Sequence, residues 1–542
     1  MPSLRRFVAA IIALTILGIC LFSHLGALGL VGPDEPRYAW IAREMADSGD
    51  WITPRLYGQP WFEKPVLYYW CAGAGFRLLN SPEWAARLPS ALAALLSALA
   101  IAWLAWVFYG LRSAWVCLLI FPTTVAAIGF ARAGTPDMLF AAWLAVSMCG
   151  AAGIAHRHGA LRQLSADAHV SNSSVTNLVL FGGSLGLATL AKGPAAIVLA
   201  AGSLGLWIAA TSRWRSARHF LHPLAVASFC AIAAPWYVLC ALRNSDFLRT
   251  FLVLHNFERF VTPVFQHQQP FWFFAPILLM ATLPWTALLA KTIYEGWGAF
   301  RGDAWKDSPG VFLACWAIFP ALFFSFSESK LPGYILPSIP ALSILLAVSA
   351  VRSFEAESRV NRWIWIGVGL TWVVALAAPV QRMLRFMPRG LQRSESREVY
   401  AVLAAAAAAG IVIAILTVLR HRRAALALSA VLTAALVEVA GAGVLPHFDP
   451  YLSARATAVA WRTMPDVRQN LQGFDLNRSW LYGLNFYFEK EVSEWSPQDP
   501  DGAYVLTNPA GIQELRKTGR SFRVPPMSGV SPQAWEVVVY PK

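Results

Sequence analysis

Long runs of uncharged, apolar residues recur along most of the chain and constrain its fold more than any other feature. Of the 542 residues, 57% are hydrophobic and only 14% are charged, whereas a soluble protein carries roughly 25% charged residues. An apolar run of about 20 residues crosses a bilayer as a helix. Beyond a first run at 7–31, such runs occur near 88–108, 114–130, 138–155, 178–191, 194–211, 220–242, 271–290, 311–327, 335–351, 363–380, 401–419 and 424–445. The pattern predicts an all-α polytopic membrane bundle of about thirteen transmembrane helices, in which 178–211 is either two spans or one broken hairpin.

The positions of the positive charges predict the orientation of this bundle. Arg5 and Arg6 precede the first apolar run, which is longer than the core of a signal peptide, so we expect a retained helix that starts in the cytoplasm. When spans are counted from there, the loops expected inside hold Arg112, Arg157, Arg162, Arg213, Arg215, Arg218, Lys291, Arg301, Lys306, Arg352, Arg359, Arg362, Arg420, Arg422 and Arg423. This agreement with the positive-inside rule accounts for much of the net charge of +14. We therefore expect no nucleic acid as a partner.

The residues after about 446 differ from the rest of the chain because they are polar and rich in Asp, Asn, Pro and Trp. An odd number of spans places them outside. A helix-like segment at 453–463 and strand-like segments at 480–488 and 503–507 predict a small α/β domain, in which we find no catalytic motif. We therefore expect a transmembrane domain at 1–446 and an outer soluble domain at 447–542.

The first outer loop, residues 32–83, concentrates charged residues beside the membrane. Its segments 37–47 and 65–79 predict helices that lie along the membrane surface. Charges at a bilayer edge are costly unless they pair or bind a ligand. Each charge taken alone therefore fits either a functional cluster or a plain interfacial salt bridge. The charged residues concerned are Asp34, Glu35, Arg37, Glu63 and Lys64.

Acids and bases from four later segments are expected on the same outer side as this loop. They are Asp137, Lys192, the residues His255, Glu258 and Arg259 of the 243–270 loop, and Lys330 with Tyr334. A convergent polar cluster at one face of the membrane is the default candidate for an active site. A transporter, which many spans would equally suit, normally has polar groups near the midplane and often inverted repeats. We find no repeat in this chain.

Several of these residues stand in short motifs that occur together in a known family. The first loop reads Gly-Pro-Asp34-Glu35-Pro-Arg37-Tyr38, and Phe-Glu63-Lys64-Pro follows. The later motifs are Ala-Arg87-Leu-Pro, Thr-Pro-Asp137, Ala-Lys192-Gly-Pro and Lys330-Leu-Pro. With these motifs the chain resembles the membrane glycosyltransferases of the GT-C class. Within that class it is most similar to the lipid A aminoarabinose (4-amino-4-deoxy-L-arabinose) transferases, which are related to the protein O-mannosyltransferases.

The resemblance implies a GT-C fold and a pentosyltransferase that moves 4-amino-4-deoxy-L-arabinose from undecaprenyl phosphate to a lipid A phosphate. The reaction would take place on the periplasmic face of the bacterial inner membrane, with the C-terminal domain also periplasmic. It would lower the negative charge of lipid A and confer resistance to polymyxin and other cationic peptides. The implied partners are the lipid-linked donor, lipid A and the bilayer, and the implied state is a monomer. The alternatives are an enzyme similar to the protein O-mannosyltransferases and a lipid or sugar transporter.

The departing lipid phosphate requires cations and hydroxyl donors. Candidates are Arg37, Tyr38, Lys64, Lys192, Arg259, Lys330 and Tyr334, although an interfacial tyrosine also suits a membrane anchor. We take Asp34 and Asp137 as the catalytic candidates. Asp34 is the natural base for a hydroxyl acceptor, whereas with a phosphate acceptor it would orient that acceptor or hold the amino group of the sugar. Asp137 and Glu63 would position cations or that ammonium group, with Glu35 in support.

Four further features stay open in the sequence. Glu63, His255 and His267 are weak candidates for a divalent metal site, because they lack the short spacing of recognisable ligands. The family often has an acid-His pair before Arg-Phe, where this chain reads His255-Asn-Phe-Glu258-Arg259-Phe. Glu438 lies inside the last apolar run, either as a site, as a paired acid or as a side chain that extends (snorkels) towards the nearby outer face. The loop 381–400, expected outside, holds Arg382, Arg385, Arg389, Arg393 and Arg397, so either the span count is wrong there or these arginines bind an anion such as a lipid A phosphate.

Overall fold

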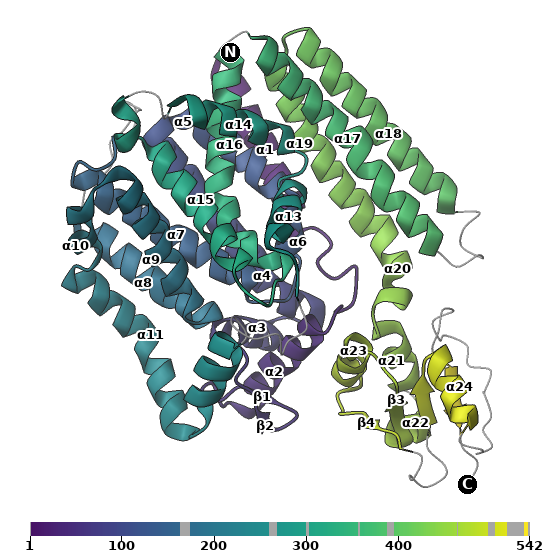
Figure 1. The fold of residues 1–542 in the computed structure, drawn as a ribbon. Helices are drawn as coiled ribbons and strands as arrows, with labels where there is room; N and C mark the ends of the chain where they lie inside the picture. The colour runs from purple at the N-terminus through teal and green to yellow at the C-terminus, as the bar shows by residue number, and fades with distance from the viewer. Residues whose placement is uncertain are drawn as a thin grey trace.

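The protein consists of a large helical body and a small α/β part near the C-terminus. The computed structural model describes residues 2–162, 174–258, 268–299, 303–355, 358–386, 395–462, 464–496, 504–517 and 536–539. Figure 1 shows the N-terminus at the top of the helical body and the C-terminus at the small domain on the lower right. Helices α17, α18 and α19 form a layer beside the main body, and α20 leads from this layer to the small domain (Figure 1).

The apolar runs form most of the helices of the large body, as the sequence predicts. Before the middle of the chain these are α1 (Pro2–Phe22), α4 (Pro82–Tyr109), α5 (Leu111–Ile120), α6 (Val125–Ala131), α7 (Asp137–Arg157), α8 (Ser174–Lys192), α9 (Ala195–Thr211), α10 (Ala217–Phe220) and α11 (Pro223–Arg243). After it these are α13 (Phe274–Ala281), α14 (Thr286–Ala299), α15 (Pro309–Ser325), α16 (Ile339–Glu355), α17 (Arg359–Phe386), α18 (Glu395–Val418), α19 (Arg422–Val439) and α20 (Leu445–Leu452). The run 178–211 forms two helices, α8 and α9.

Six of the described helices are long and apolar enough to cross a membrane, and the number reaches eight if each of two bent helix pairs is one span. One pair, formed by α5 and α6, bends by 62°, and the other, formed by α13 and α14, bends by 115°. Four further apolar helices have only 10–17 residues, fewer than a perpendicular span requires. The all-α membrane bundle is confirmed, and the count of about thirteen crossings stays a prediction.

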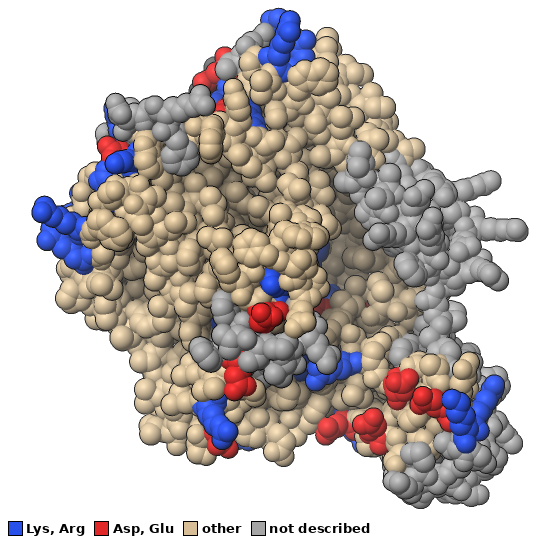
Figure 2. All heavy atoms as spheres, in the orientation of Figure 1, with Lys and Arg blue, Asp and Glu red and all other residues tan. Residues whose placement is uncertain are grey.

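On the face shown in Figure 2, charged side chains are nearly absent from the middle of the helical body. In Figure 2, Lys, Arg, Asp and Glu gather along the upper and left edges and in the lower part of the visible face, with a broad uncharged area between them. Such a band is what a bilayer requires, because a charge in its interior is costly. Helix α7 lies inside the body, with 89% of its apolar segment buried, whereas α11 has 22% buried and borders the lipid.

Close packing of α7 against α8 brings two sequence motifs to one end of the body. A side chain at Gly150 of α7 would place its Cβ 2.7 Å from the backbone nitrogen of Phe181 on α8, so a small residue is needed for this approach. The two helices are joined through 163–173 and pack along each other. Because they are neighbours that run in opposite directions, the start of α7 at Asp137 meets the end of α8 at Lys192.

The first outer loop contains the two predicted surface helices, α2 (Asp34–Ser48) and α3 (Leu67–Leu78). A two-stranded hairpin, β1 (Arg55–Leu56) and β2 (Gln59–Pro60), lies between them. Its two turn residues, Tyr57 and Gly58, have φ of 54° and 78°, as a type I′ turn requires. Helix α2 packs against α3, and together they cover one end of the bundle beside α4.

The first apolar run is helical only to Phe22, so its predicted extent to residue 31 is wrong. The following residues turn instead of continuing the helix, and His24 has a φ of 53°. Two arginines satisfy the carbonyls that this irregular backbone leaves free, which an apolar setting demands. Arg87 donates to the carbonyls of Leu25, Leu28 and Gly29, and Arg455 donates to those of Gly26 and Ala27.

The small domain is built on a four-stranded mixed sheet. The strands are β3 (Leu471–Phe474), β4 (Ser493–Glu494), β5 (Tyr504–Thr507) and β6 (Glu536–Val539), in the order β4-β3-β5-β6. Only the β5–β6 pair is antiparallel. Its helices are α21 (Arg455–Arg462), α22 (Pro465–Asn470), α23 (Arg478–Phe488) and α24 (Pro509–Lys517). The α/β class is as expected, and the boundary at 446/447, which stays a prediction, falls within α20.

Two of the three element predictions in this domain are confirmed and one is wrong. The helix expected at 453–463 is α21 and the strand expected at 503–507 is β5. The segment 480–488, expected as a strand, is helix α23. The side chain of Asn477 caps this helix by accepting a hydrogen bond from the backbone of Trp480 at 3.0 Å. The buried residues Trp480, Leu484, Tyr487 and Phe488 lie on one face of the helix, because their spacing follows its period.

Candidate active site

The charged residues of the first loop form one connected group around Arg37. Asp34 and Arg37 lie one turn apart in α2, and Arg37 Nη2 is 2.6 Å from Asp34 Oδ1. The same nitrogen is 2.9 Å from Glu63 Oε2, and Lys64 Nζ is 3.5 Å from the other oxygen of Glu63. The hydroxyl of Tyr38 lies 3.4 Å from Arg37 Nη2 and 3.5 Å from Glu63 Oε1. These five residues, all of them site candidates from the sequence, therefore lie in one connected group.

Asp34 is the member of this group that is open to a ligand. Its side chain is 49% exposed, whereas those of Arg37 and Glu63 are 8% and 10% exposed. Partial burial of its carboxyl group raises the pKa of Asp34 above the ordinary value, and the charges of Glu63 and Asp137 raise it further. The charges of Arg37 and Lys64 lower this pKa but do not outweigh the effect of burial. A carboxyl group with a raised pKa takes up and releases a proton closer to neutral pH than an ordinary aspartate.

A second group lies where α7 begins and α8 ends. Lys192, the last residue of α8, forms an ion pair with Asp137, the first residue of α7. Each charge has the sign that its helix end favours. The Lys192 ammonium lies 5.1 Å from the ring centroid of Tyr334 and 5.4 Å from that of Phe140. Tyr334 is thus placed beside the cation, as expected for a residue of the same site.

The two groups are close neighbours at one end of the helical body. The charge of Asp137 acts on the pKa of Asp34 together with those of Glu63 and Lys64. The loop that carries Tyr334 also contacts Asp137, since a Cβ on Gly333 would lie 3.5 Å from Asp137 Oδ1 and 2.8 Å from the Phe130 ring. Three carboxylates and three cations therefore face each other: Asp34, Glu63 and Asp137 with Arg37, Lys64 and Lys192.

The remaining predicted site residues either lie away from these two groups or fall outside the described residues. Lys330 is buried, and its ammonium donates to the backbone carbonyls of Ser327 at 2.6 Å and Gln269 at 2.9 Å, so it holds two loops together. Arg259, His267 and the side chain of His255 lie outside the described residues. The arginine side chains of 381–400 also lie outside the described part of the chain. Of this predicted loop, residues 381–386 belong to helix α17 and residues 395–400 to helix α18.

Glu35, for which the sequence suggested a supporting role in the site, contacts three separate segments of the chain. Its carboxylate is buried and binds the Arg87 guanidinium through two contacts of 3.0 and 2.7 Å. It also accepts hydrogen bonds from the backbone of Val31 at 2.9 Å and of Gly134 at 2.6 Å. Glu35 therefore ties α2, α4 and the loop before Asp137 to one another.

A cavity opens beside Asp34. Its volume is about 360 Å³. Apolar residues make up much of its wall, among them Leu25, Leu28, Val31 and Leu445. Polar residues at its edge include Asp34, His24 and Arg132. Glu438 lies near this edge as a paired acid, since its carboxylate is 2.7 Å from Nε2 of His24.

Two residues that sequence reasoning missed lie against Arg37. The Arg37 guanidinium carbon is 5.7 Å from the ring centroid of Trp61 and 5.6 Å from that of Tyr482. Tyr482 belongs to α23 of the small domain, where no catalytic motif was found. No sequence signal would have found it, because the contact depends on how the small domain sits on α2.

No group of three or more His, Cys, Asp or Glu side chains that could hold a metal ion occurs in the part of the chain that the structure describes. Glu63, one of the weak metal candidates, is engaged by Arg37 and Lys64.

Comparisons with known proteins bear on both fold and family. The sequence model of the dolichyl-phosphate-mannose-protein mannosyltransferase family matches residues 7–251. The crystal structure of ArnT from Cupriavidus metallidurans bound to undecaprenyl phosphate superposes with a TM-score of 0.76, covers 100% of both chains and is 24% identical. The apo structure of that protein has the same TM-score at 23% identity. The chain has the GT-C fold.

Sequence relatives of this chain are described as aminoarabinose transferases. The undecaprenyl phosphate-alpha-4-amino-4-deoxy-L-arabinose arabinosyl transferase of Edwardsiella ictaluri (strain 93-146) is 36% identical over 349 residues, which are 64% of this chain and 60% of that protein. The protein of the same description from Aeromonas salmonicida (strain A449) is 34% identical over 354 residues, 64% of this chain and 62% of that protein. The matches thus span less than two thirds of these relatives. The resemblance read from the motifs is confirmed, and the chain is a multi-pass membrane protein.

Proposed function

We propose that this GT-C protein is a glycosyltransferase that moves 4-amino-4-deoxy-L-arabinose from undecaprenyl phosphate to a lipid A phosphate. The observation that carries the proposal is the cluster of three carboxylates and three cations at one end of the membrane body. The descriptions of the relatives name this sugar and this lipid carrier, and the similar ArnT structure is bound to undecaprenyl phosphate. The site and the small domain would then face the periplasm from the bacterial inner membrane. The reaction would lower the charge of lipid A and confer resistance to cationic peptides such as polymyxin.

The charge balance of the cluster suits this donor. The donor carries an anionic phosphate and a cationic amino group on the same molecule, so it needs both signs of charge close together. The cations Lys64 and Lys192 each sit against a carboxylate, Glu63 and Asp137 respectively. When the donor binds, its phosphate can take one of these cations, and its ammonium group can take the carboxylate that the cation releases. A neutral sugar would leave that carboxylate uncompensated.

The reaction needs little proton transfer if the acceptor is a phosphate. An oxygen of the acceptor phosphate attacks the anomeric carbon of the sugar, and the bond from that carbon to the undecaprenyl phosphate oxygen breaks. The electron pair of this bond leaves with the lipid phosphate, whose new negative charge Lys64 and Lys192 stabilise. Asp34 then orients the reactants. The cavity of about 360 Å³ beside Asp34 gives the acceptor an approach apart from Lys64 and Lys192, and two other cations, Arg87 and Arg132, line it.

A hydroxyl acceptor is the second candidate, because the matching family model is that of protein mannosyltransferases. A hydroxyl group must lose its proton as it attacks, and Asp34 is positioned to take it. Burial raises the pKa of Asp34, which makes it a better base than an ordinary aspartate. The two candidates differ in the product and not in the residues used.

The lipid A of a strain that lacks its own transferase tests the proposal. The strain is complemented with the wild-type chain, with Asp34→Asn, or with Asp47→Asn. Asp47 is a matched control, since it is an exposed acid in the last turn of the same helix. We expect an aminoarabinose-sized addition to lipid A with the wild type and Asp47→Asn and none with Asp34→Asn. Unmodified lipid A with the wild type overturns the proposal, and a sugar found on a protein in that strain favours the second candidate.

A further inference from the structure

Helix α23 of the small domain lies along α2, the helix that carries Asp34 and Arg37. The contact side chains of α23 recur at helical spacing and so share one face. Asn485 donates from Nδ2 to the Tyr57 hydroxyl at 2.8 Å. The ring of Phe486 lies 3.9 Å from the Arg43 guanidinium carbon. Tyr482 begins this face and lies against Arg37.

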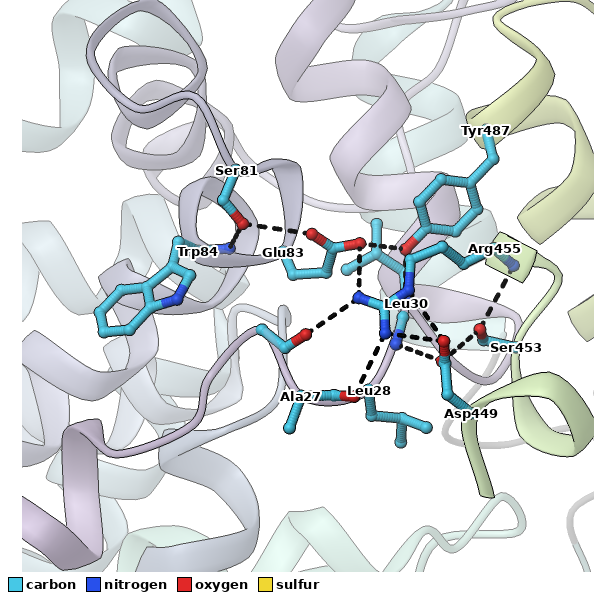
Figure 3. Close-up of polar contacts among 12 residues, drawn as sticks. Ala27, Leu28, Leu30, Ser81, Glu83, Trp84, Asp449, Ser453, Arg455 and Tyr487 are labelled. Carbon is cyan, nitrogen blue, oxygen red and sulfur yellow. Dashed lines mark hydrogen bonds and ion pairs between the residues drawn. The ribbon is translucent and has the colours of Figure 1, made fainter. Parts of the chain in front are cut away.

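A separate network holds the small domain in place against the first loop (Figure 3). Arg455 binds Asp449 at 2.7 Å and Glu83 of α4 at 3.2 Å. The hydroxyl of Tyr487 donates to Glu83 at 2.8 Å and accepts from the backbone of Leu30 at 2.8 Å. Because Tyr487 belongs to α23, this network fixes the position of α23, and with it the ring of Tyr482.

Aromatic rings surround the Arg37 guanidinium on several sides. Its carbon lies 5.1 Å from the ring centroid of Tyr38, 5.7 Å from that of Trp61 and 5.6 Å from that of Tyr482, all within the range of a cation–π contact. The contacts to Asp34 and Glu63 both use Nη2, and Nε is buried without a hydrogen-bond partner among the described residues. The rings therefore fix the plane of the guanidinium where hydrogen bonds do not.

We propose that Tyr482 is a positioning residue of the active site, whose ring holds Arg37 where it bridges Asp34 and Glu63. The small domain thereby completes the transmembrane site with one side chain. This inference rests on the proposed function, since it concerns the same carboxylates. Without the ring, the guanidinium keeps its contacts to Tyr38 and Trp61 but is less restrained on the side of the small domain. It can then shift so that Nη2 no longer bridges the two acids, which moves the nearest cation away from Asp34.

Moving Arg37 away from Asp34 should shift the pH dependence of the reaction, which a general loss of protein stability would not do. Burial raises the pKa of Asp34, and Arg37 is the strongest influence in the opposite direction. Moving Arg37 away therefore raises that pKa further. The groups that face Asp34 are Arg37, Glu63, Lys64 and Asp137 on the cluster side and His24, Glu35, Arg87 and Arg132 on the cavity side. If the reaction requires ionised Asp34, the acid side of the pH–rate profile shifts to higher pH.

The test compares Tyr482→Ala, Tyr482→Phe and Tyr504→Ala in the purified full-length protein. Tyr504 is a matched control, because it is a half-buried tyrosine of the same domain on β5. Sugar transfer is measured over a range of pH and donor concentration, and thermal unfolding is measured for each variant. We expect Tyr482→Ala to lower kcat about tenfold, as for the loss of a partly buried cation–π contact, with a smaller change in the KM for the donor and an acid limb at higher pH. Tyr482→Phe keeps the ring and should retain most of the activity and the wild-type pH profile.

The outcomes separate this inference from the function on which it rests. Tyr504→Ala should change the unfolding temperature without changing the pH profile. If Tyr482→Ala has wild-type kcat and pH profile, or if its profile matches that of Tyr504→Ala, the positioning role is wrong. If the wild type itself transfers no sugar while folded, the proposed function fails. If the wild type is active and Asp34→Asn is inactive, the function stands whatever Tyr482 does.

Discussion

Replacing Glu35 by alanine should destabilise the outer end of the helical body more than any other single change in the first loop. The Glu35 and Arg87 side chains are 6% and 5% exposed. Glu35 accepts two contacts from Arg87 and one each from the backbone nitrogens of Val31 and Gly134. The substitution therefore leaves a buried cation without its counter-charge and two backbone groups without an acceptor.

The expected loss follows from these contacts. Removing one partner of a buried ion pair costs about 3–5 kcal/mol. Arg87 still donates to three backbone carbonyls through Nη1 and Nη2, but its Nε and one Nη2 hydrogen lose their acceptor and its charge is unpaired, so we expect about 4 kcal/mol. Glu355→Ala is the matched control, since Glu355 pairs with Arg112 at 2.8 Å with both side chains mostly exposed. An exposed pair of this kind contributes roughly 0–1 kcal/mol.

Thermal unfolding in detergent, followed by tryptophan fluorescence, measures the difference between the two variants. Glu35→Ala should unfold well below the wild type or fail to accumulate as folded protein. The unfolding temperature of Glu35→Gln should lie between those of the wild type and Glu35→Ala, because an amide keeps one acceptor oxygen but loses the charge. Equal unfolding temperatures for Glu35→Ala and Glu355→Ala would refute the reasoning that the Glu35–Arg87 pair ties α2, α4 and the loop before Asp137 together.

Three further predictions concern the site and the small domain. Lys192→Met should lower kcat roughly 10- to 100-fold through the loss of a charge-assisted contact to the leaving phosphate. The control is Lys306→Met, which removes an exposed cation at the other end of the body and should have wild-type kinetics in the same assay. Transfer activity should fall on acidification, because protonation removes the charge of Asp34. The midpoint of this fall should lie above the ordinary aspartate pKa, since burial raises the pKa of Asp34, and a midpoint at the ordinary value contradicts this prediction. Tyr487→Phe removes a hydrogen bond to Glu83 and should cost about 1–2 kcal/mol of unfolding free energy, measured against Tyr504→Phe, and equal values for the two variants count against the network of Figure 3.

The membrane body and the first-loop cluster could be predicted because both depend on nearby residues. Apolar runs set the helices, and a helix brings Asp34 and Arg37 onto one face through their spacing of three residues. The pairing of Asp137 with Lys192 was predictable only as a shared side of the membrane. Its contact distance depends on how closely α7 approaches α8 at Gly150.

The small domain was harder to predict because its pattern is ambiguous. The segment 480–488 is rich in aromatic residues, which favour strands, so its helical spacing of buried positions was overlooked. The capping Asn477 was a local signal for the helix. The end of α1 was missed for another reason. Its irregular continuation is stabilised by Arg87 and Arg455, and the second of these is distant in sequence.

Transfer by the purified protein tests the central claim most directly. The protein is reconstituted in vesicles with undecaprenyl phosphate-linked aminoarabinose and lipid A, and the lipids are analysed by mass spectrometry with fragmentation. The wild type and Asp47→Asn should release undecaprenyl phosphate and place the sugar on a lipid A phosphate, and Asp34→Asn should do neither. Intact donor with the folded wild type, or a sugar attached to lipid A at a hydroxyl group, would contradict the account.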